Sequence, residues 1–306
     1  MTEQPQVSTH DAAEDARNAD IRIYVNGEIV HRDDAKISVY DSGFLLGDGV
    51  WEGLRVHDGH IPFLAEHLDR LFEAALFIDL DIGKTREDLI AAIWATLGAN
   101  GMTTDAHIRL MVTRGRKKKP FQHPHLSVHG PTIVIIAEHS KPDASVVARG
   151  IRLFTVPHHR GLPLTQDAKL NSHSKLNCII PLTLAVRAGA DEALMLDPFG
   201  FVNTTNACNF FIVRKGEVWT STGAYCMNGI TRQAVIDLCR EDGIPVFERD
   251  FSLMETYGAE EAFLTGTFGA QTPVFEIDGR PIGQRRAGPV FHRIRALYQA
   301  RIAAGA

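Results

Sequence analysis

Apolar and polar positions recur with clear periods along the first half of the chain. Residues 21–30, IRIYVNGEIV, alternate on both sides of Asn26-Gly27, a pair that favours a two-residue turn, and so predict a β-hairpin. Helical spacing of apolar residues then predicts helices, and short apolar runs are typical of strands. The further elements predicted in this half are helices 61–78 and 85–98 and strands 106–115 and 131–139.

The same interleaving of strands and helices restarts after Lys141-Pro142. The elements predicted there are strand 150–156, helix 176–188, strands 192–197 and 209–213, hairpin 213–220, helix 230–241, strands 244–248 and 261–265, and helix 288–302. We find no internal repeat, so this alternation predicts an α/β (α+β) protein with mixed sheets in two domains. The expected boundaries are a disordered tail 1–20, a small N-terminal α/β domain 21–140, a linker 141–150 and a larger C-terminal domain 151–306.

Composition narrows the class of protein. The chain has 306 residues, of which 44% are apolar and 23% charged, as expected for a globular protein with two cores. A net charge of −5 offers no basic field for nucleic acid or an anionic membrane, and no apolar run is long enough to span a bilayer. The polar, acidic first twenty residues lack the apolar core of a signal peptide. Four cysteines without a C-x-x-C pair favour a reducing cytoplasm.

Two features of the long polar loop 114–130 suggest chemistry but have simpler explanations. His123, His125 and His129 have no acidic or cysteine partner at ligand spacing, so we expect no metal site. The run Lys117–Lys119 is typical of a solvated surface, and a specific anion site is the less favoured alternative.

Two further features are the glycines of residues 41–55 and a possible phosphate-binding site, called here the phosphate cup, formed by residues 229–231 and 265–273. Gly47-Asp48-Gly49 resembles part of a dinucleotide fingerprint, but no strand precedes it, so we interpret the glycines of 41–55 as points of close backbone approach. Gly229 and Thr231 at the start of helix 230–241 could place backbone N–H groups and a hydroxyl against an anion, but taken alone they are better explained by an ordinary helix start. The hydroxyl-rich loop 265–273 is either a turn or the rest of that cup.

Three cationic side chains are candidates for the site. Arg70 lies beside the apolar stripe of its helix, where a surface ion pair is the simpler interpretation. Lys169 and Lys175 lie in DAKLNSHSKLNC, residues 167–178. A lysine in a loop just before a buried helix can be desolvated, which lowers its pKa and frees the amine as a nucleophile. Lys175 stands at the start of the predicted helix, so spacing alone favours Lys169 only weakly.

Five stretches together resemble the class IV, fold-type IV, pyridoxal-phosphate aminotransferases. In chain order they are GFLLGDGVWEGLRV, HLDRL, AGADEALMLD, GITR and EAFLTGTFGAQTPV, and the likeness runs from about residue 21 to 300. That family holds branched-chain and D-amino-acid aminotransferases, (R)-selective amine transaminases and aminodeoxychorismate lyase. The resemblance implies a homodimer whose larger domain is a pseudo-barrel that binds pyridoxal 5′-phosphate.

The resemblance also implies a role for individual residues. Lys169 would form the internal Schiff base, because it stands about thirty-five residues before Thr204, whereas Lys175 would leave that interval too short. The implied cofactor-binding residues are Arg70, Lys169, Thr204, Thr205, Gly229, Ile230, Thr231 and Thr267. The implied substrate-binding residues are Arg109, which would face the substrate carboxylate, with Trp51, Phe268 and Gly269.

Two departures from the family pattern affect the expected chemistry. Thr204 stands where the family has a glutamate that pairs with the pyridine nitrogen, and a neutral hydroxyl stabilises a pyridinium less than a carboxylate does. The aromatic residue that follows the family's lysine is also missing here. The sequence therefore predicts a cytoplasmic aminotransferase, most similar to the branched-chain type, acting on amino acids and 2-oxo acids. The alternatives are an aminodeoxychorismate-type lyase, a D-amino-acid or (R)-amine transaminase, and a pyridoxal-phosphate-binding protein with poor turnover.

Overall fold

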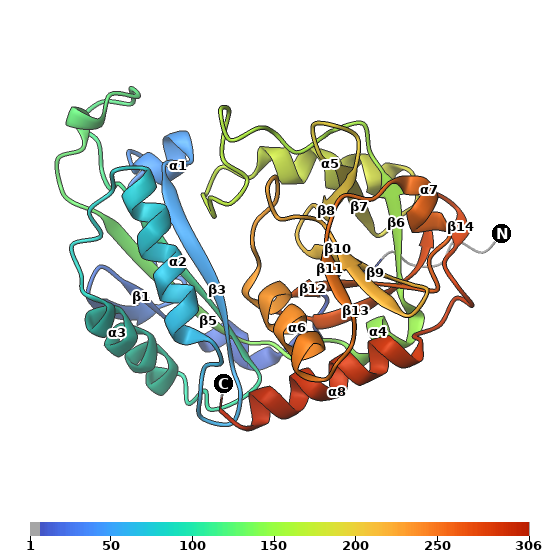
Figure 1. Cartoon of the computed structure of the whole chain (residues 1–306). Coiled ribbons are helices and arrows are strands. Elements are labelled where there is room, and N and C mark those ends of the chain that lie inside the picture. Colours follow the sequence, from blue (N-terminus) through green and yellow to red (C-terminus); the bar gives the residue numbers. More distant parts are fainter. Residues whose placement is uncertain (1–6, 306) are drawn as a thin grey trace. The chain divides into compact units, whose positions relative to one another are not determined.

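The computed structural model describes residues 7–305 and divides them into two compact units. Unit 1 comprises residues 7–12, 142–169 and 176–304, and unit 2 comprises residues 13–141 and 170–175 with residue 305 (Figure 1). One of the points where the chain passes from one unit to the other lies between Lys141 and Pro142. The segment expected as a linker, 141–150, contains a helix, α4 (Ala144–Arg149).

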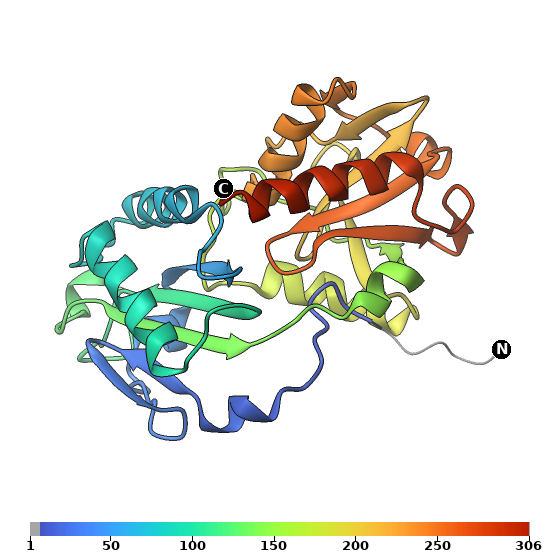
Figure 2. The ribbon, with the colours of Figure 1, turned by 90° about the horizontal axis from the view of Figure 1, so that it is seen from below.

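Unit 2 is built on a five-stranded antiparallel sheet in the order β2-β1-β5-β4-β3. Helices α2 and α3 cover one face of this sheet (Figure 2), and their leucines pack with the inward-facing residues of β3, β4 and β5. The elements are β1 Arg22–Val25, β2 Glu28–His31, α1 Ser42–Leu46, β3 Gly49–Val56, α2 Leu64–Phe77, α3 Arg86–Ala99, β4 Ala106–Thr113 and β5 Thr132–His139, with short 3-10 helices at Ala16–Asp20 and Pro124–Leu126.

Local sequence explains several of these elements. Asn26 and Gly27 both have positive φ, as a two-residue hairpin turn requires, which confirms the predicted hairpin. Thr85 and Asp88 form a capping box that begins α3. The interpretation of the glycines as points of close approach is confirmed at Gly49, where a Cβ would lie 2.6 Å from the Val112 carbonyl oxygen.

Two features of unit 2 differ from the sequence-based expectation. Strand β3 was not predicted, because glycines as frequent as those of 41–55 are typical of loops. Lys117 was expected on a solvated surface, yet it is only 2% exposed and its Nζ donates to the His123 carbonyl at 3.2 Å. Lys118 and Lys119 are exposed, as expected.

Unit 1 contains a sheet that closes on itself. Strands β9, β12, β13, β6, β7 and β8 follow one another, and the pair Thr204–Asn209 joins β8 back to β9. This closed ring is the predicted pseudo-barrel. Helices α6 and α8 cover it through an apolar cluster that includes Val235, Phe263 and Phe291.

The three helices predicted in unit 1 are confirmed, but two short helices, α4 and α7, and some strands were not predicted. The elements of unit 1 are α4, β6 Ile151–Thr155, α5 Leu176–Arg187, β7 Glu192–Leu196, β8 Val202–Thr205, β9 Asn209–Arg214, β10 Glu217–Thr220, α6 Ile230–Glu241, β11 Val246–Glu248, α7 Leu253–Tyr257, β12 Glu261–Gly266, β13 Ala270–Ile277, β14 Arg280–Pro281 and α8 Pro289–Ala303. Strands β8 and β13 were not predicted, since threonines and a proline interrupt their apolar pattern.

The N-terminal segment also differs from expectation. Residues 1–20 were expected to be a disordered tail; residues 1–6 lie outside the described part of the chain. From Val7 on the chain is packed: Val7 and Thr9 are buried in unit 1 and Ala16–Asp20 forms a 3-10 helix in unit 2. Polar composition predicted disorder, but side-chain acceptors from distant residues provide the hydrogen bonds that hold this segment.

Candidate active site

Arg70 is held by a buried carboxylate in unit 2. Glu52 of β3 is 0% exposed and accepts from Nε and Nη2 of Arg70, each at 2.7 Å. His67, three residues before Arg70 on the same face of α2, hydrogen-bonds to the same carboxylate at 2.7 Å. Burial raises the pKa of Glu52, but the hydrogen bonds from Arg70 and His67 outweigh it and hold that pKa below its usual value. The guanidinium is therefore fixed in one orientation.

Arg109 and Trp51 form a second cluster on the neighbouring strands of unit 2. The Arg109 guanidinium carbon lies 3.8 Å from the Trp51 ring centroid, and Lys175 Nζ lies 5.4 Å from it. Burial lowers the pKa of Arg109. Among the described residues no carboxylate lies within ion-pair distance of Arg109. A solvent-accessible cation without an acidic partner, stacked on an aromatic ring, suits a carboxylate of a small ligand.

The segment 170–175 joins unit 2 as a short extension of its sheet. Trp51 N–H donates to the Asn171 carbonyl at 3.1 Å, and His173 N–H donates to the Gly49 carbonyl at 2.9 Å. Lys175 Nζ donates to Asn171 Oδ1 at 3.0 Å, which keeps its amine beside Trp51. This pairing was not predicted from the sequence, because strand β3 was not predicted.

Lys169 has a different environment, in unit 1. Its side chain is exposed, and its backbone N–H donates to Asp167 Oδ1 at 2.9 Å. The helix that follows, α5, buries only Pro181 and Ala185 and leaves Leu176 exposed. The expectation that a buried helix desolvates Lys169 is therefore wrong for this structure, and the interval to Thr204 remains the reason for choosing Lys169.

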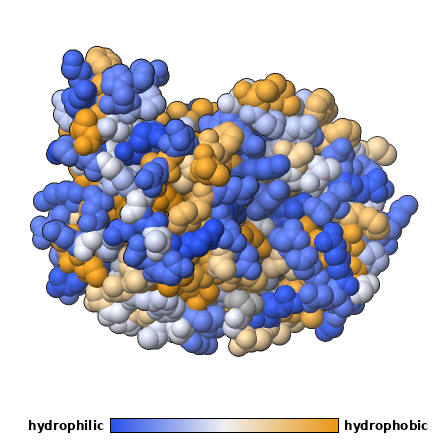
Figure 3. All heavy atoms as spheres, turned by 60° about the vertical axis from the view of Figure 1, so that its left-hand side comes forward, coloured by the Kyte–Doolittle hydropathy of each residue, from blue (hydrophilic) through white to orange (hydrophobic). Residues whose placement is uncertain are grey.

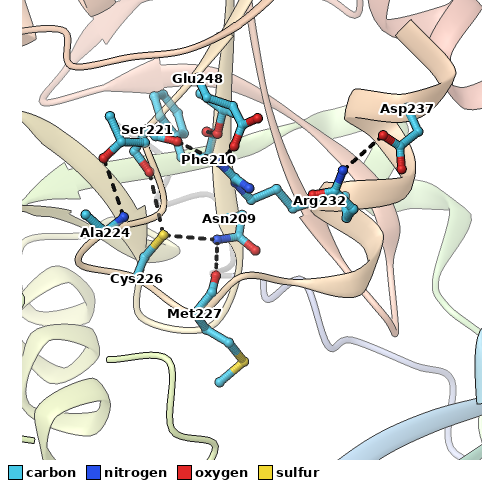
Figure 4. A network of polar contacts seen from close by, with 12 residues as sticks. Asn209, Phe210, Ser221, Ala224, Cys226, Met227, Arg232, Asp237 and Glu248 are labelled. Atoms are coloured by element: carbon cyan, nitrogen blue, oxygen red, sulfur yellow. Dashed lines mark hydrogen bonds and ion pairs between the residues drawn. The ribbon is translucent and has the colours of Figure 1, made fainter. Parts of the chain in front are cut away.

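The N-terminus of α6 is arranged to receive an anion. Gly229 is the N-cap and no side chain caps the helix, so the N–H groups of Ile230 and Thr231 are left for a ligand. Asn209 fixes the approach to this turn, since its Nδ2 donates to the Met227 carbonyl at 2.8 Å (Figure 4). A Cβ at Gly229 would lie 2.3 Å from Asn209 Oδ1, so only glycine fits.

The base of the same helix is fixed from behind. Arg232, almost fully buried, donates from Nη2 to the Ser221 carbonyl at 2.7 Å and to Glu248 Oε2 at 2.9 Å (Figure 4). These bonds connect the first turn of α6 to the end of strand β10, at Ser221, and to strand β11, at Glu248. The sequence predicted Gly229, Ile230 and Thr231 but not the supporting residues Asn209 and Arg232.

Thr204 and Thr205 lie at the barrel closure in unit 1 and are both buried. Thr204 Oγ1 donates to the Cys208 carbonyl at 2.8 Å, so its only hydrogen is used and the hydroxyl can act toward a ligand only as an acceptor. A buried carboxylate, Glu192, lies near this element, but its Oε2 is 3.5 Å from Thr205 Oγ1 and is not bonded to Thr204. No carboxylate is bonded to Thr204 within residues 7–305.

The third predicted part of the cup is the turn between β12 and β13. Thr267 is half-buried, Phe268 is buried, and Ala270 completes the turn with φ of 55°. Arg70, Trp51 and Arg109 thus lie in unit 2, and Thr204, Gly229, Thr231 and Thr267 lie in unit 1. Within unit 2 these residues make two separate contacts, Arg70 with Glu52 and Arg109 with Trp51, and within unit 1 Gly229 and Thr231 stand at the start of α6.

Known proteins share both the sequence and the fold of this chain. The family model for class IV amino-transferases matches residues 49–277. The chain is 41% identical over 282 residues, 92% of its length, to branched-chain-amino-acid aminotransferase-like protein 2 of Arabidopsis thaliana, and it spans about half of that relative's length (50%). It is 36% identical over 286 residues to a branched-chain-amino-acid aminotransferase of Pseudomonas aeruginosa, covering 90% of this chain and 91% of that one.

A solved structure agrees in fold and carries the cofactor. An aminotransferase from Brucella abortus bound to the cofactor PLP superimposes with a TM-score of 0.80 at 28% identity, covering 91% of this chain and 98% of that one. The residues described above fit such a cofactor. No side chain caps the N-terminus of α6, so its first N–H groups can bind an anion such as a phosphate, and the close approach of Asn209 to Gly229 keeps this turn free of a side chain. The chain therefore belongs to the class IV aminotransferases, the family that uses pyridoxal 5′-phosphate.

Proposed function

We propose that this protein is an aminotransferase that moves an amino group between an amino acid, of the branched-chain type or similar, and a 2-oxo acid. The observation that carries this proposal is Arg109, a guanidinium stacked on Trp51 with no acidic partner among the described residues. Such a group binds the carboxylate that amino acids and 2-oxo acids share. The branched-chain preference rests on the names of the relatives. The Arabidopsis relative is about twice as long as the part that this chain matches.

Each group of residues has a task in this reaction. Pyridoxal phosphate supplies a carbonyl carbon that bonds to amines and a ring that withdraws electrons. The first-turn N–H groups of α6 and Thr267 would hold the phosphate from unit 1, and Arg70 is the candidate phosphate ligand of unit 2. Arg109 orients the substrate carboxylate, and the amine of Lys169 moves the α-proton as a general base.

Lys169 is our choice for the covalent attachment of the cofactor, as an internal Schiff base, on its interval to Thr204. Lys175 is the second candidate, because its Nζ lies beside Trp51, the ring on which Arg109 also stacks. The two lysines belong to different units, so their surroundings give each a distinct chemical environment.

The test of the proposed activity is the half-reaction with single amino donors. An aminotransferase converts the bound cofactor to pyridoxamine phosphate when L-, D- or (R)-amine donors are supplied, and the donor that works identifies the preference. An aminodeoxychorismate-type lyase releases pyruvate and leaves the cofactor unaminated, and a protein that only binds pyridoxal phosphate does neither. Either of these last two outcomes would exclude the proposed function.

A variant tests the observation on which the proposal rests. Arg109→Ala should raise KM for amino acids far more than for amines that lack a carboxylate, since only the former lose a charged partner. Equal effects on both kinds of substrate would mean that Arg109 is structural and that another group binds the carboxylate.

We further propose a homodimer in the cytoplasm. Exposed apolar side chains gather in one short stretch of unit 2, with Val39 67% and Phe44 69% exposed, and the flanking members are Ile37, Tyr40 and Leu46. Apolar surface is also interspersed with polar groups on the face seen in Figure 3. All four cysteines are free thiols, which fits a reducing compartment, and no described helix is long and apolar enough to cross a membrane. Light scattering at two concentrations tests the dimer, with a monomer as the excluding result.

A further inference from the structure

The N-terminal strap, residues 7–12, adds a segment to unit 1 on the side of the β12–β13 turn. Its ends are fixed by the backbone, since Ala12 bridges to Pro142 and Asp143 N–H donates to the Asp11 carbonyl at 3.0 Å. Val7 N–H donates to Asp191 Oδ1 at 3.0 Å. The strap is therefore held along its whole length rather than only touching the surface.

A buried carboxylate depends on this strap. Glu192 is 1% exposed, and within residues 7–305 no cation lies at ion-pair distance from it. Thr9 provides its close donors, with the backbone N–H at 2.9 Å and the hydroxyl on the same Oε1. A carboxylate buried without a cation needs such donors, because desolvation otherwise destabilises its charged form. Thr205 Oγ1 lies 3.5 Å from Glu192 Oε2, but it donates its hydrogen to the Cys208 carbonyl at 3.0 Å, so Thr9 is the main source of donors to Glu192.

The strap also lies directly against the turn that carries Thr267. The His10 ring stacks on the buried Phe268 ring with centroids 5.9 Å apart and planes 15° apart. A Cβ on Gly269 would lie only 3.1 Å from the Thr9 carbonyl oxygen, so the two backbones are in close contact. Thr9 therefore contacts both Glu192 of β7 and the turn next to Thr267.

We propose that the strap is a positioning element of the cofactor site. Thr9 and His10 hold the Thr267–Gly269 turn where Thr267 would donate to the cofactor phosphate, and Thr9 links that turn to the buried Glu192 of β7. The inference rests on the proposed function for the role of Thr267. It adds residues far from the family motifs to the set that determines cofactor affinity.

The experiment compares matched variants of the full chain for affinity toward pyridoxal phosphate, by fluorescence titration of the apo-protein, and for the Tm of the apo-protein. Deletion of residues 2–12 removes the strap, and deletion of residues 2–6 is its control. Thr9→Val removes only the hydroxyl, Thr9→Ser restores it, and the exposed His10→Ala removes the stacking without burying a new group.

We expect Thr9→Val to raise the Kd by up to about tenfold, the limit reached if the whole free energy of the lost hydrogen bond to Glu192 is transmitted to the Thr267 turn. His10→Ala and the 2–12 deletion should also raise it, whereas Thr9→Ser and the 2–6 deletion should leave it within about twofold. A lower Tm with unchanged Kd in both point variants would overturn the proposal, because the strap would then be only structural. If the unaltered chain fails to bind pyridoxal phosphate, the proposed function fails, and the role of the strap fails with it.

Discussion

The two groups of candidate site residues satisfy their polar groups in opposite ways. In unit 2 the cation Arg70 is held by the fully buried Glu52, so charge is balanced by charge. In unit 1 the candidate ligands are hydroxyls and backbone N–H groups, and Thr204 carries no charge where the family has a glutamate. Buried charge pairs are costly to break, whereas neutral donors tolerate replacement. Substitutions should therefore affect the two groups very differently.

The largest effect is expected at Glu52. Glu52→Gln leaves the Arg70 charge without its partner and should lower the free energy of unfolding by about 3–5 kcal/mol, measured by chemical denaturation. The control Asp69→Asn removes the partner of Arg86 in an exposed ion pair and should change stability little. Similar losses from both variants would remove the distinction between buried and exposed pairs.

The same variant carries a pH signature. Burial raises the pKa of Glu52, but Arg70 and His67 lower it further, so its folded pKa lies below the ordinary value of 4.5. A lowered folded pKa means that the stabilisation is complete above the unfolded pKa and is lost as pH falls through the folded value. The stability difference between the unaltered chain and Glu52→Gln should shrink on acidification below pH 4.5, and a constant difference would contradict the charge-pair account.

A smaller effect is expected at Arg70 itself. If the guanidinium binds the cofactor phosphate, Arg70→Ala should weaken cofactor affinity by roughly 1.5–3 kcal/mol, about tenfold to a hundredfold. Equilibrium dialysis of the folded variant measures this loss. Unchanged affinity would return Arg70 to a purely structural ion pair with Glu52.

The smallest effect is expected in the neutral group. Thr204→Glu should raise the pKa of the cofactor's ring nitrogen if the new carboxylate reaches it, because an opposite charge favours the protonated form. The pH dependence of the cofactor's absorbance reports this shift. Glutamate is larger than threonine, so a loss of stability from crowding is expected alongside. An unshifted titration in a folded variant would show that residue 204 does not face the ring.

Sequence reasoning succeeded where the signal is local. Helix α6 and its Gly229-Ile230-Thr231 start were predicted from a glycine followed by apolar residues at helical spacing. The partner of Arg70 was not predicted. Glu52 belongs to β3, whose frequent glycines are typical of a loop, and the pairing of this strand with its neighbours depends on tertiary packing. The joining of residues 170–175 to unit 2 is equally non-local. Thr204 was singled out only through the family resemblance.

The central claim is that Lys169 forms the covalent bond to the cofactor. Lys175 is the alternative, and its amine lies beside a candidate substrate-binding residue. Lys169 is exposed in unit 1, whereas Lys175 lies beside Trp51 in unit 2. Borohydride reduction of the cofactor-loaded protein, followed by peptide mapping, places the pyridoxyl label on one residue. Our account predicts the label on Lys169, and a label on Lys175 would contradict it.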